Sequence, residues 1–179
     1  KRQGGRISVR YTMGNPERVD GLILLSASGA PRKEEGGPPM ALRLMRNPVG
    51  RFFIKRIWSR NMARKTLEDM VFDKSSITDE EIDRMWDLST YPGNMDAMFR
   101  EFAESWEDFN QTEIGGITTN TLLIWGEEDS ICPISMGSWY DSQLPNSTMV
   151  VLPDIGHNPH FECPNRCLDE ISSWMGTLS

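Results

Sequence analysis

Residues 121–133 read TLLIWGEEDSICP, and residues 148–164 read TMVVLPDIGHNPHFECP. Each stretch begins with a short apolar run that ends at a glycine or a proline. Runs of this length, bounded by turn residues, are typical of strands buried on both faces of a parallel sheet. In an open parallel sheet, ligands and reactive groups gather outside the carboxyl ends of the strands. We therefore expect Asp129, after the first run, and His157, after the second, to reach the same edge of one sheet.

A third buried strand is expected at residues 22–25, where four apolar residues precede the turn-forming residues 26–29. The segment before it, residues 4–15, is ambiguous by periodicity, because its apolar residues alternate like a strand while a helix competes. Residues 165–178 carry apolar side chains at helical intervals directly after Pro164, and we expect a helix there. Strands and helices thus alternate, which is typical of an α/β domain.

A long segment of different character separates the first two strands. It opens with residues 31–39, which are rich in glycine and proline and predict a loop. Beyond that loop the apolar residues recur at helical spacing. We expect short helices at residues 51–58 and 62–72, and an apolar stripe on one helix face formed by Phe99, Phe102, Trp106 and Phe109. The segment is interpreted as a helical insertion.

The start of one helix in this insertion is well specified. Thr78 is the expected N-cap, and Glu81, three residues later, is its partner in a capping box. Ile77 and Ile82 flank the cap and are spaced to pack against each other as a hydrophobic staple. These residues predict a helix that begins directly after Thr78.

Composition and charge exclude several classes of function. The chain has 179 residues, with 19 Lys and Arg against 26 Asp and Glu, so its formal charge of -7 argues against a nucleic-acid partner. No apolar run approaches the ~20 residues of a membrane-spanning helix. An odd count of three cysteines favours a reducing compartment, and with no signal-peptide pattern we expect a cytoplasmic protein.

In the order of its motifs the chain resembles the lid-bearing α/β-hydrolases. In that family a Gly-x-x-Asp turn follows the seventh strand, a Gly-His turn follows the eighth, and a helical cap is inserted after the sixth. Asp129 and His157 match in order and spacing (157 − 129 = 28 residues), and residues 15–25 look like the passage into the sixth strand. The resemblance implies the C-terminal portion of an α/β-hydrolase sheet, with about three parallel strands. It also implies a division into core residues 1–30, a cap at residues 31–112 and core residues 113–179.

The resemblance also implies roles for the two loop residues. The family order of Ser, Asp and His is satisfied for its last two members. Asp129 would accept the Nδ1 hydrogen of His157 and fix the ring, and His157 would act as general base and then as general acid. Each loop alone fits a simple turn equally well, but the two together, in this order, favour the catalytic interpretation.

The nucleophile is missing from its expected place. The family's elbow is Gly-x-Ser-x-Gly, and Gly4-Gly5 fits its end, which favours a helix over residues 5–15. Counting back two residues from Gly4 gives Arg2, whose guanidinium stays protonated and cannot attack a carbonyl. Either the first residues are the edge of a truncated or misread sequence, or this is a true variant with an inactive elbow. We favour truncation, since the first five strands are absent too, and an Asp nucleophile stays open.

Other candidates are weaker. His160 lies near His157, but no third clustered ligand suggests zinc, and no phosphate-binding or dinucleotide motif occurs, so we expect no metal and no cofactor. Cys163 and Cys167 are interpreted as buried thiols. Two further residues, Ser26 and Ser28, end a strand at the reactive edge and either line a pocket or simply form a turn.

Two hypotheses of function follow. The first is a hydrolase that acts on a small apolar ester, or a related acyl or carbon–carbon bond, under a cap that resembles those of the ring-cleavage-product hydrolases. The second is a non-catalytic binding protein that keeps the fold with Arg2 at the elbow. When residues 1–179 are expressed alone, residues 22–25 would form an open sheet edge, so we expect a homodimer or aggregation through that edge.

Overall fold

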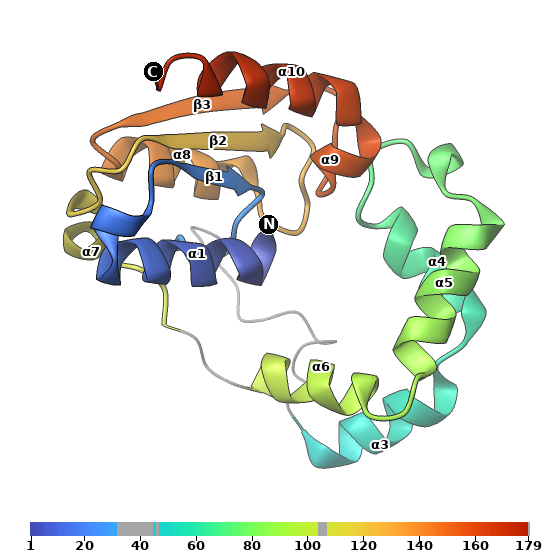
Figure 1. Ribbon diagram of the computed structural model, residues 1–179. Coiled ribbons are helices and arrows are strands. Elements are labelled where there is room, and N and C mark those ends of the chain that lie inside the picture. Colours follow the sequence, from blue (N-terminus) through green and yellow to red (C-terminus); the bar gives the residue numbers. More distant parts are fainter. Residues whose placement is uncertain (32–44, 46, 104–106, 179) are drawn as a thin grey trace. The chain divides into compact units, whose positions relative to one another are not determined.

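The computed structural model describes residues 1–31, 45, 47–103 and 107–178 (Figure 1). These residues form two compact units. We call the first the core unit, with Lys1–Lys33, Met70–Lys74 and Glu107–Ser179, and the second the cap unit, with Glu34–Asp69 and Ser75–Trp106. The division differs from the expected cap at residues 31–112, because residues 70–74 and 107–112 pack with the core unit.

The core unit contains one parallel sheet of three strands in the order β1-β2-β3. The strands are β1 (Leu22–Leu25), β2 (Thr121–Gly126) and β3 (Ser147–Leu152). Thr121 of β2 pairs with Leu22 on one side and with Ser147 on the other. The three parallel strands expected from the sequence are confirmed.

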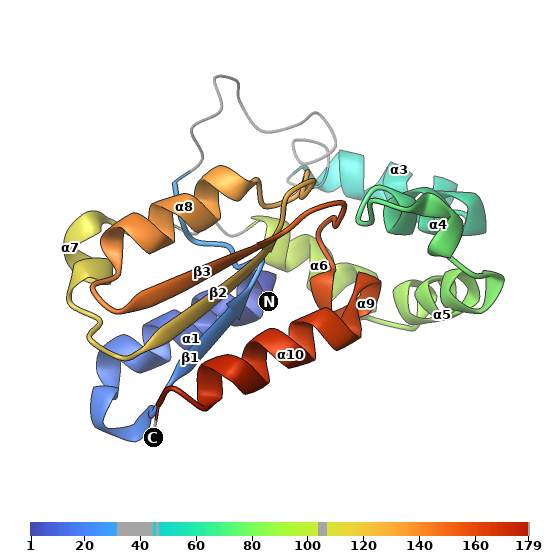
Figure 2. The ribbon, with the colours of Figure 1, turned by 90° about the horizontal axis from the view of Figure 1, so that it is seen from above.

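Helices cover both faces of this sheet (Figures 1 and 2). The helices of the core unit are α1 (Arg2–Gly14), α7 (Gln111–Gly115), α8 (Ile134–Gln143), α9 (Pro159–Glu162) and α10 (Pro164–Met175), with a short 3₁₀ turn, η1 (Pro16–Arg18), before β1. Of these, α1 and α8 pack on one face of the sheet and α10 packs on the other. The ambiguous segment at residues 4–15 is helical, and α10 lies at the helix expected for residues 165–178.

Alternate side chains of β2 serve the two faces. Leu123 and Trp125 pack in a cluster with residues of α1 and α8, whereas Leu122 and Ile124 pack with residues of α10. All six residues of β2 are buried, as a central strand of an α/β sheet requires. The expectation of burial on both faces is wrong for β3, where Val151 is 39% exposed, because β3 pairs with β2 alone.

The cap unit is helical. Its helices are α3 (Pro48–Ile57), α4 (Arg60–Glu68), α5 (Asp79–Thr90) and α6 (Asn94–Ala103), and the 3₁₀ turn η2 (Lys74–Ser76) precedes α5. The capping box expected at the start of α5 is confirmed, since Thr78 Oγ1 accepts from Glu81 N and Glu81 Oε2 accepts from Thr78 N. Ile82 is fully buried beside this cap.

Two expectations within the insertion are wrong. The helix expected at residues 62–72 ends at Glu68, because Met70 O accepts a hydrogen bond from His157 N and this holds the chain in the core unit. Phe109 does not continue the helical stripe of Phe99. Instead its amide donates to Gly29 O at 2.7 Å, and its ring is buried in the core unit. Phe102 and Trp106 lie outside the described side chains.

The loops after β2 and β3 meet backbone to backbone at Gly126. A Cβ at this position would lie 2.1 Å from Gly156 O and 2.4 Å from Ile155 O. We expect Gly126→Ala to lower the free energy of unfolding by about 3 kcal/mol, since the clashing atoms are backbone and cannot turn aside. Urea denaturation would measure the change.

The control for this substitution is Gly14→Ala. Gly14 is the last residue of α1, and a Cβ there would meet nothing within 4 Å. It should leave stability unchanged or raise it by less than about 1 kcal/mol. Equal stability of the two variants would contradict the close approach of the two loops.

Candidate active site

Asp129 follows β2 in the first of the two loops. The residue is 4% exposed, and its Oδ1 accepts hydrogen bonds from Ile131 N at 2.9 Å and from Cys132 N at 2.8 Å. Short polar side chains commonly close a turn in this way. The two bonds fix the carboxylate at the carboxyl end of β2.

His157 follows β3 in the second loop and meets that carboxylate. Its Nδ1 lies 2.8 Å from Asp129 Oδ2 and 3.0 Å from Oδ1, and the imidazole is buried. Because an ionised carboxylate only accepts hydrogen bonds, Nδ1 carries the hydrogen and donates it. The structure thus brings together the two residues that the sequence singles out.

The other ring nitrogen of His157 has different surroundings. Nε2 is buried and has no hydrogen-bond partner among the described residues. Leaving a buried polar atom unpaired generally costs about 1–3 kcal/mol, so such atoms call for a specific explanation. With the hydrogen held on Nδ1, Nε2 carries the lone pair and is ready to accept a proton.

Arg2 stands at a sharp turn at the start of α1 and forms an isolated parallel bridge with Ala27. Its φ is +46°, a value rare for residues other than glycine, and α1 begins at this residue. Arg2 N donates to Ser26 O at 3.0 Å, and Ser28 N donates to Arg2 O at 3.2 Å, which aligns Arg2 with the end of β1. A strained strand-to-helix turn is what a nucleophile elbow requires.

Close packing behind this turn agrees with an elbow at Arg2. A Cβ at Gly5 would lie 2.6 Å from Ala27 Cβ, so only glycine allows α1 to approach the end of β1 so closely. Lys1 Nζ donates to Asn158 Oδ1, and Asn158 is the residue after His157. The turn at Arg2 and the loop of His157 therefore lie at the same end of the sheet.

The two serines at the end of β1 have different surroundings. Ser26 is fully buried with φ +44°, and its Oγ has no partner among the described residues. Ser28 is half-buried and donates to Gln3 Oε1 at 3.1 Å. Neither serine is hydrogen-bonded to His157 within the part of the chain that the structure describes.

The remaining candidates lie outside the pair of loop residues. His160 is exposed. Cys167 is 3% exposed, and its burial, with Cys163 close by, raises the pKa of its thiol to about 12. No described group of three His, Cys, Asp or Glu side chains could hold a metal ion. Within the described ranges, no helix is long and apolar enough to cross a membrane.

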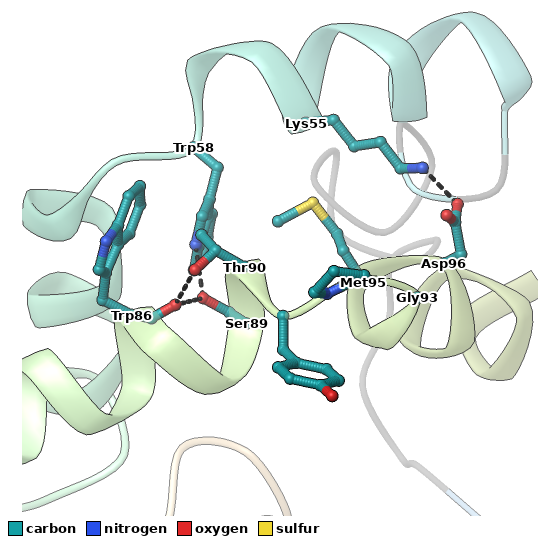
Figure 3. A pocket seen from close by; sticks show the side chains of 10 residues that line it. Lys55, Trp58, Trp86, Ser89, Thr90, Gly93, Met95 and Asp96 are labelled. Atoms are coloured by element: carbon teal, nitrogen blue, oxygen red, sulfur yellow. Dashed lines mark hydrogen bonds and ion pairs between the residues drawn. The ribbon is translucent and has the colours of Figure 1, made fainter.

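The cap unit contains a cavity of about 250 Å³ (Figure 3). Trp58 Nε1 donates to Ser89 Oγ at 2.8 Å in its wall, and Lys55 pairs with Asp96 at one side. The cavity is lined by Lys55, Trp58, Trp86, Ser89, Thr90, Tyr91, Pro92, Gly93, Met95 and Asp96. This lining combines aromatic side chains with one ion pair and contains no histidine or cysteine.

Comparisons with known sequences identify the family of the chain and several relatives. The sequence profile described as alpha/beta hydrolase fold matches residues 3–164. YugF of Bacillus subtilis, named an uncharacterized hydrolase, is 30% identical over 172 residues, which make up 96% of this chain and 62% of YugF. A 2-hydroxy-6-oxononadienedioate/2-hydroxy-6-oxononatrienedioate hydrolase of Cupriavidus pinatubonensis is 25% identical over 89% of this chain and 54% of its own length.

Solved structures show the same fold at lower identity. The 2-hydroxy-6-oxo-6-phenylhexa-2,4-dienoate hydrolase BphD of Rhodococcus sp. strain RHA1 has a TM-score of 0.82 at 18% identity, over 98% of this chain and 62% of that one. An esterase from Thermogutta terrifontis has a TM-score of 0.74 at 23% identity, over 99% of this chain and 63% of that one.

The chain spans about three fifths of YugF and about half of the Cupriavidus enzyme. Its three parallel strands correspond to the C-terminal portion of the fold. Since the family profile matches most of the sequence, the chain belongs to the α/β-hydrolase fold family.

Proposed function

We propose that the protein is a hydrolase in which Asp129 and His157 are the orienting acid and the general base of a Ser-Asp-His-type triad. The observation that carries this proposal is the different hydrogen bonding of the two ring nitrogens of His157. Asp129 holds its Nδ1 at 2.8 Å, while Nε2 is buried and unpaired among the described residues. A buried imidazole fixed on one side and open on the other is arranged for proton transfer.

The proposed chemistry follows from this arrangement. His157 Nε2 takes the proton of a nucleophilic hydroxyl as that oxygen attacks the substrate carbonyl, and the resulting imidazolium is stabilised by Asp129. The imidazolium then gives the proton to the leaving group, which departs and leaves an acyl-enzyme. A water molecule, deprotonated by His157 in turn, hydrolyses the acyl-enzyme and restores the starting state.

We propose a small apolar ester, or a related acyl or carbon–carbon substrate, as the ligand. Relatives named 2-hydroxy-6-oxononadienedioate/2-hydroxy-6-oxononatrienedioate hydrolases support the carbon–carbon members of this class, but their substrates carry two carboxylates and do not support an apolar ligand. Activity of the whole protein on such a substrate is the claim to be tested.

The alternative of a non-catalytic binding protein rests on Arg2, which has a positive φ at the start of α1 and stands where the family resemblance puts the nucleophile. The gene sequence directly upstream of the codon for Lys1 would distinguish the hydrolase from the binding protein. An in-frame Gly-x-Ser-x-Gly, or a frameshift that restores one, would support the hydrolase. A full upstream domain that leads into Arg2 would support the binding protein.

Labelling with a fluorophosphonate probe tests the elbow directly. We expect the 179-residue chain to remain unlabelled at serine, since no described serine is hydrogen-bonded to His157 Nε2. Arg2→Ser should introduce labelling at position 2, at a rate roughly 10²- to 10³-fold below that of a complete serine hydrolase, because the described residues include only one of the two amide donors that an oxyanion hole of this family combines, that of Gln3.

Arg2→Ser combined with His157→Ala is the matched control and should abolish that labelling. Mass spectrometry of the labelled peptides would identify the site. Labelling of another serine beside His157 in the unaltered chain would contradict the proposal. No labelling of folded Arg2→Ser would show that Arg2 does not occupy the nucleophile position.

A further inference from the structure

Glu162, the last residue of α9, makes contacts that reach well beyond its own helix. Its Oε2 accepts hydrogen bonds from Phe72 N at 2.7 Å and from Gly156 N at 2.9 Å. Its Oε1 accepts from Asn158 N at 3.0 Å. One half-buried carboxylate therefore binds three backbone amides from two separate segments of the core unit.

These bonds enclose His157. Gly156 and Asn158 are its two neighbours in the chain, and the amide of His157 itself donates to Met70 O at 2.8 Å. Three consecutive amides of the loop are thus fixed, two by Glu162 and one by Met70. Because the backbone on both sides of His157 is held by hydrogen bonds, the position of its imidazole relative to Asp129 is restricted.

The segment that includes Met70 and Phe72 is held by the same carboxylate. It packs so closely on the loop that a Cβ at Gly156 would lie 2.8 Å from Phe72 N and 3.0 Å from Met70 O. Residues 70–74 belong to the core unit, while the chain on either side of them belongs to the cap unit. Glu162 therefore ties the His157 loop to the point where the insertion returns to the core unit.

A simple capping role does not account for these contacts. Capping of α9 would need only the bond to Asn158, the residue before its first turn. The bonds to Gly156 and Phe72 lie outside the helix and contribute nothing to its start. An ionised carboxylate has two acceptor oxygens and no donor, which matches three converging N–H groups. Glutamine would present a donor to at least one of them.

We infer that Glu162 is a positioning residue for His157, acting through the backbone of the loop and through the segment at residues 70–72. The inference rests on the proposed function for the role of His157. The three hydrogen bonds from Phe72 N, Gly156 N and Asn158 N to the Glu162 carboxylate, which we call the Glu162 clamp, can be tested without measuring turnover. Charge-assisted hydrogen bonds of this kind contribute more than neutral ones, so their loss should be measurable locally.

The test is amide hydrogen exchange of the full chain, with Glu162→Gln compared with Glu113→Gln. Glu113 also accepts a backbone amide hydrogen bond, from Asn110 N at 2.9 Å, but at the start of α7. Glu162→Gln should speed exchange at Phe72, Gly156 and Asn158 by roughly 10- to 100-fold, with β2 unchanged. Glu113→Gln should speed exchange at Asn110 alone.

A second readout separates positioning from mere local stability. The chain has two histidines, so the Nδ1 hydrogen of His157 can be assigned by NMR of histidine-labelled protein. Glu162→Gln should broaden or shift that resonance, and in the full-length protein it should lower kcat by about 10-fold or more with KM nearly unchanged. Glu113→Gln should change neither.

Each outcome decides the inference. If Glu162→Gln leaves exchange at Phe72, Gly156 and Asn158 unchanged, the Glu162 clamp does not stabilise these amides and the inference is overturned. Faster exchange with an unaltered His157 resonance and kcat would overturn positioning and leave a structural role. If Glu162→Gln does not fold, Glu162→Asp, which keeps the charge but shortens the reach, should show the same local pattern more weakly. A wild-type rate in His157→Ala would refute the proposed function and leave the exchange result standing.

Discussion

Replacing His157 with alanine is expected to lower kcat of the full-length protein by about 10⁴-fold or more, with little change in KM. The reason is that proton transfer through Nε2 is needed in both halves of the proposed reaction, and His157 is the base that Asp129 orients. Hydrolysis of a panel of p-nitrophenyl esters would measure the loss. Rates like those of the wild type would refute the assignment.

The matched control is His160→Ala. His160 is the other histidine of the chain, three positions further on, and it is exposed. Its removal should leave kcat within about twofold, as expected for a surface substitution. Circular dichroism of both variants would show whether the loss in His157→Ala comes from chemistry or from the fold.

Asp129→Asn tests the same pair from the other side. The asparagine oxygen can still accept from Ile131 N and Cys132 N, so the turn after β2 should persist. Its NH₂ group, however, would donate towards Nδ1 and move the ring hydrogen to Nε2, which could then no longer accept a proton. We expect a loss of about 10⁴-fold in kcat. Asp154→Asn, at an exposed position with φ +59° that asparagine tolerates, should have no effect.

The parts of this fold that the sequence predicts are those with local signals. The apolar runs of β1 and β2 each end at turn residues, and the capping box of Thr78 and Glu81 involves only four consecutive residues. Asp129 and His157 can be paired from the sequence alone, because parallel strands deliver their ends to one edge. The exposure of β3 cannot be predicted in this way, since its run of apolar residues looks like that of β2.

Glu162 cannot be singled out from the sequence. A glutamate in a short helix normally lies on the surface, and nothing in its neighbourhood signals a partner 90 residues away at Phe72. The same holds for Phe109, whose spacing from Phe99 suggests one helix face although it packs in the core unit. Contacts between distant segments decide both positions, and periodicity does not report such contacts.

The second large effect that we expect is self-association of the chain through the exposed edge of β1. Apart from an isolated bridge between Arg2 and Ala27, no strand lies beside the outer edge of β1 in the part of the chain that the structure describes. An unpaired strand edge readily pairs with another chain. We expect the 179-residue chain to form dimers or larger aggregates, which sedimentation velocity would detect.

One substitution can separate edge pairing from other association. Leu22 N donates to Asn120 O and Ser26 N donates to Ile124 O, so alternate amides of β1 face β2 and those of Ile23 and Leu25 face outward. Ile23→Pro removes an outward donor without removing a bond to β2, and proline is tolerated on edge strands. It should shift the chain towards monomer while keeping its secondary structure.

Leu24→Pro is the control, because Leu24 pairs with Leu123 of β2 and its amide lies on the side of the existing ladder. It should unfold the sheet, as proline does in paired strands. If the unaltered chain sediments as a monomer and melts in one cooperative transition, the outer edge of β1 is not a site of association. If Ile23→Pro remains folded and associates as strongly as the unaltered chain, association occurs through another surface. The apolar side chains of α3 are then the next to test, because Val49, Phe52, Phe53 and Ile57 are all exposed.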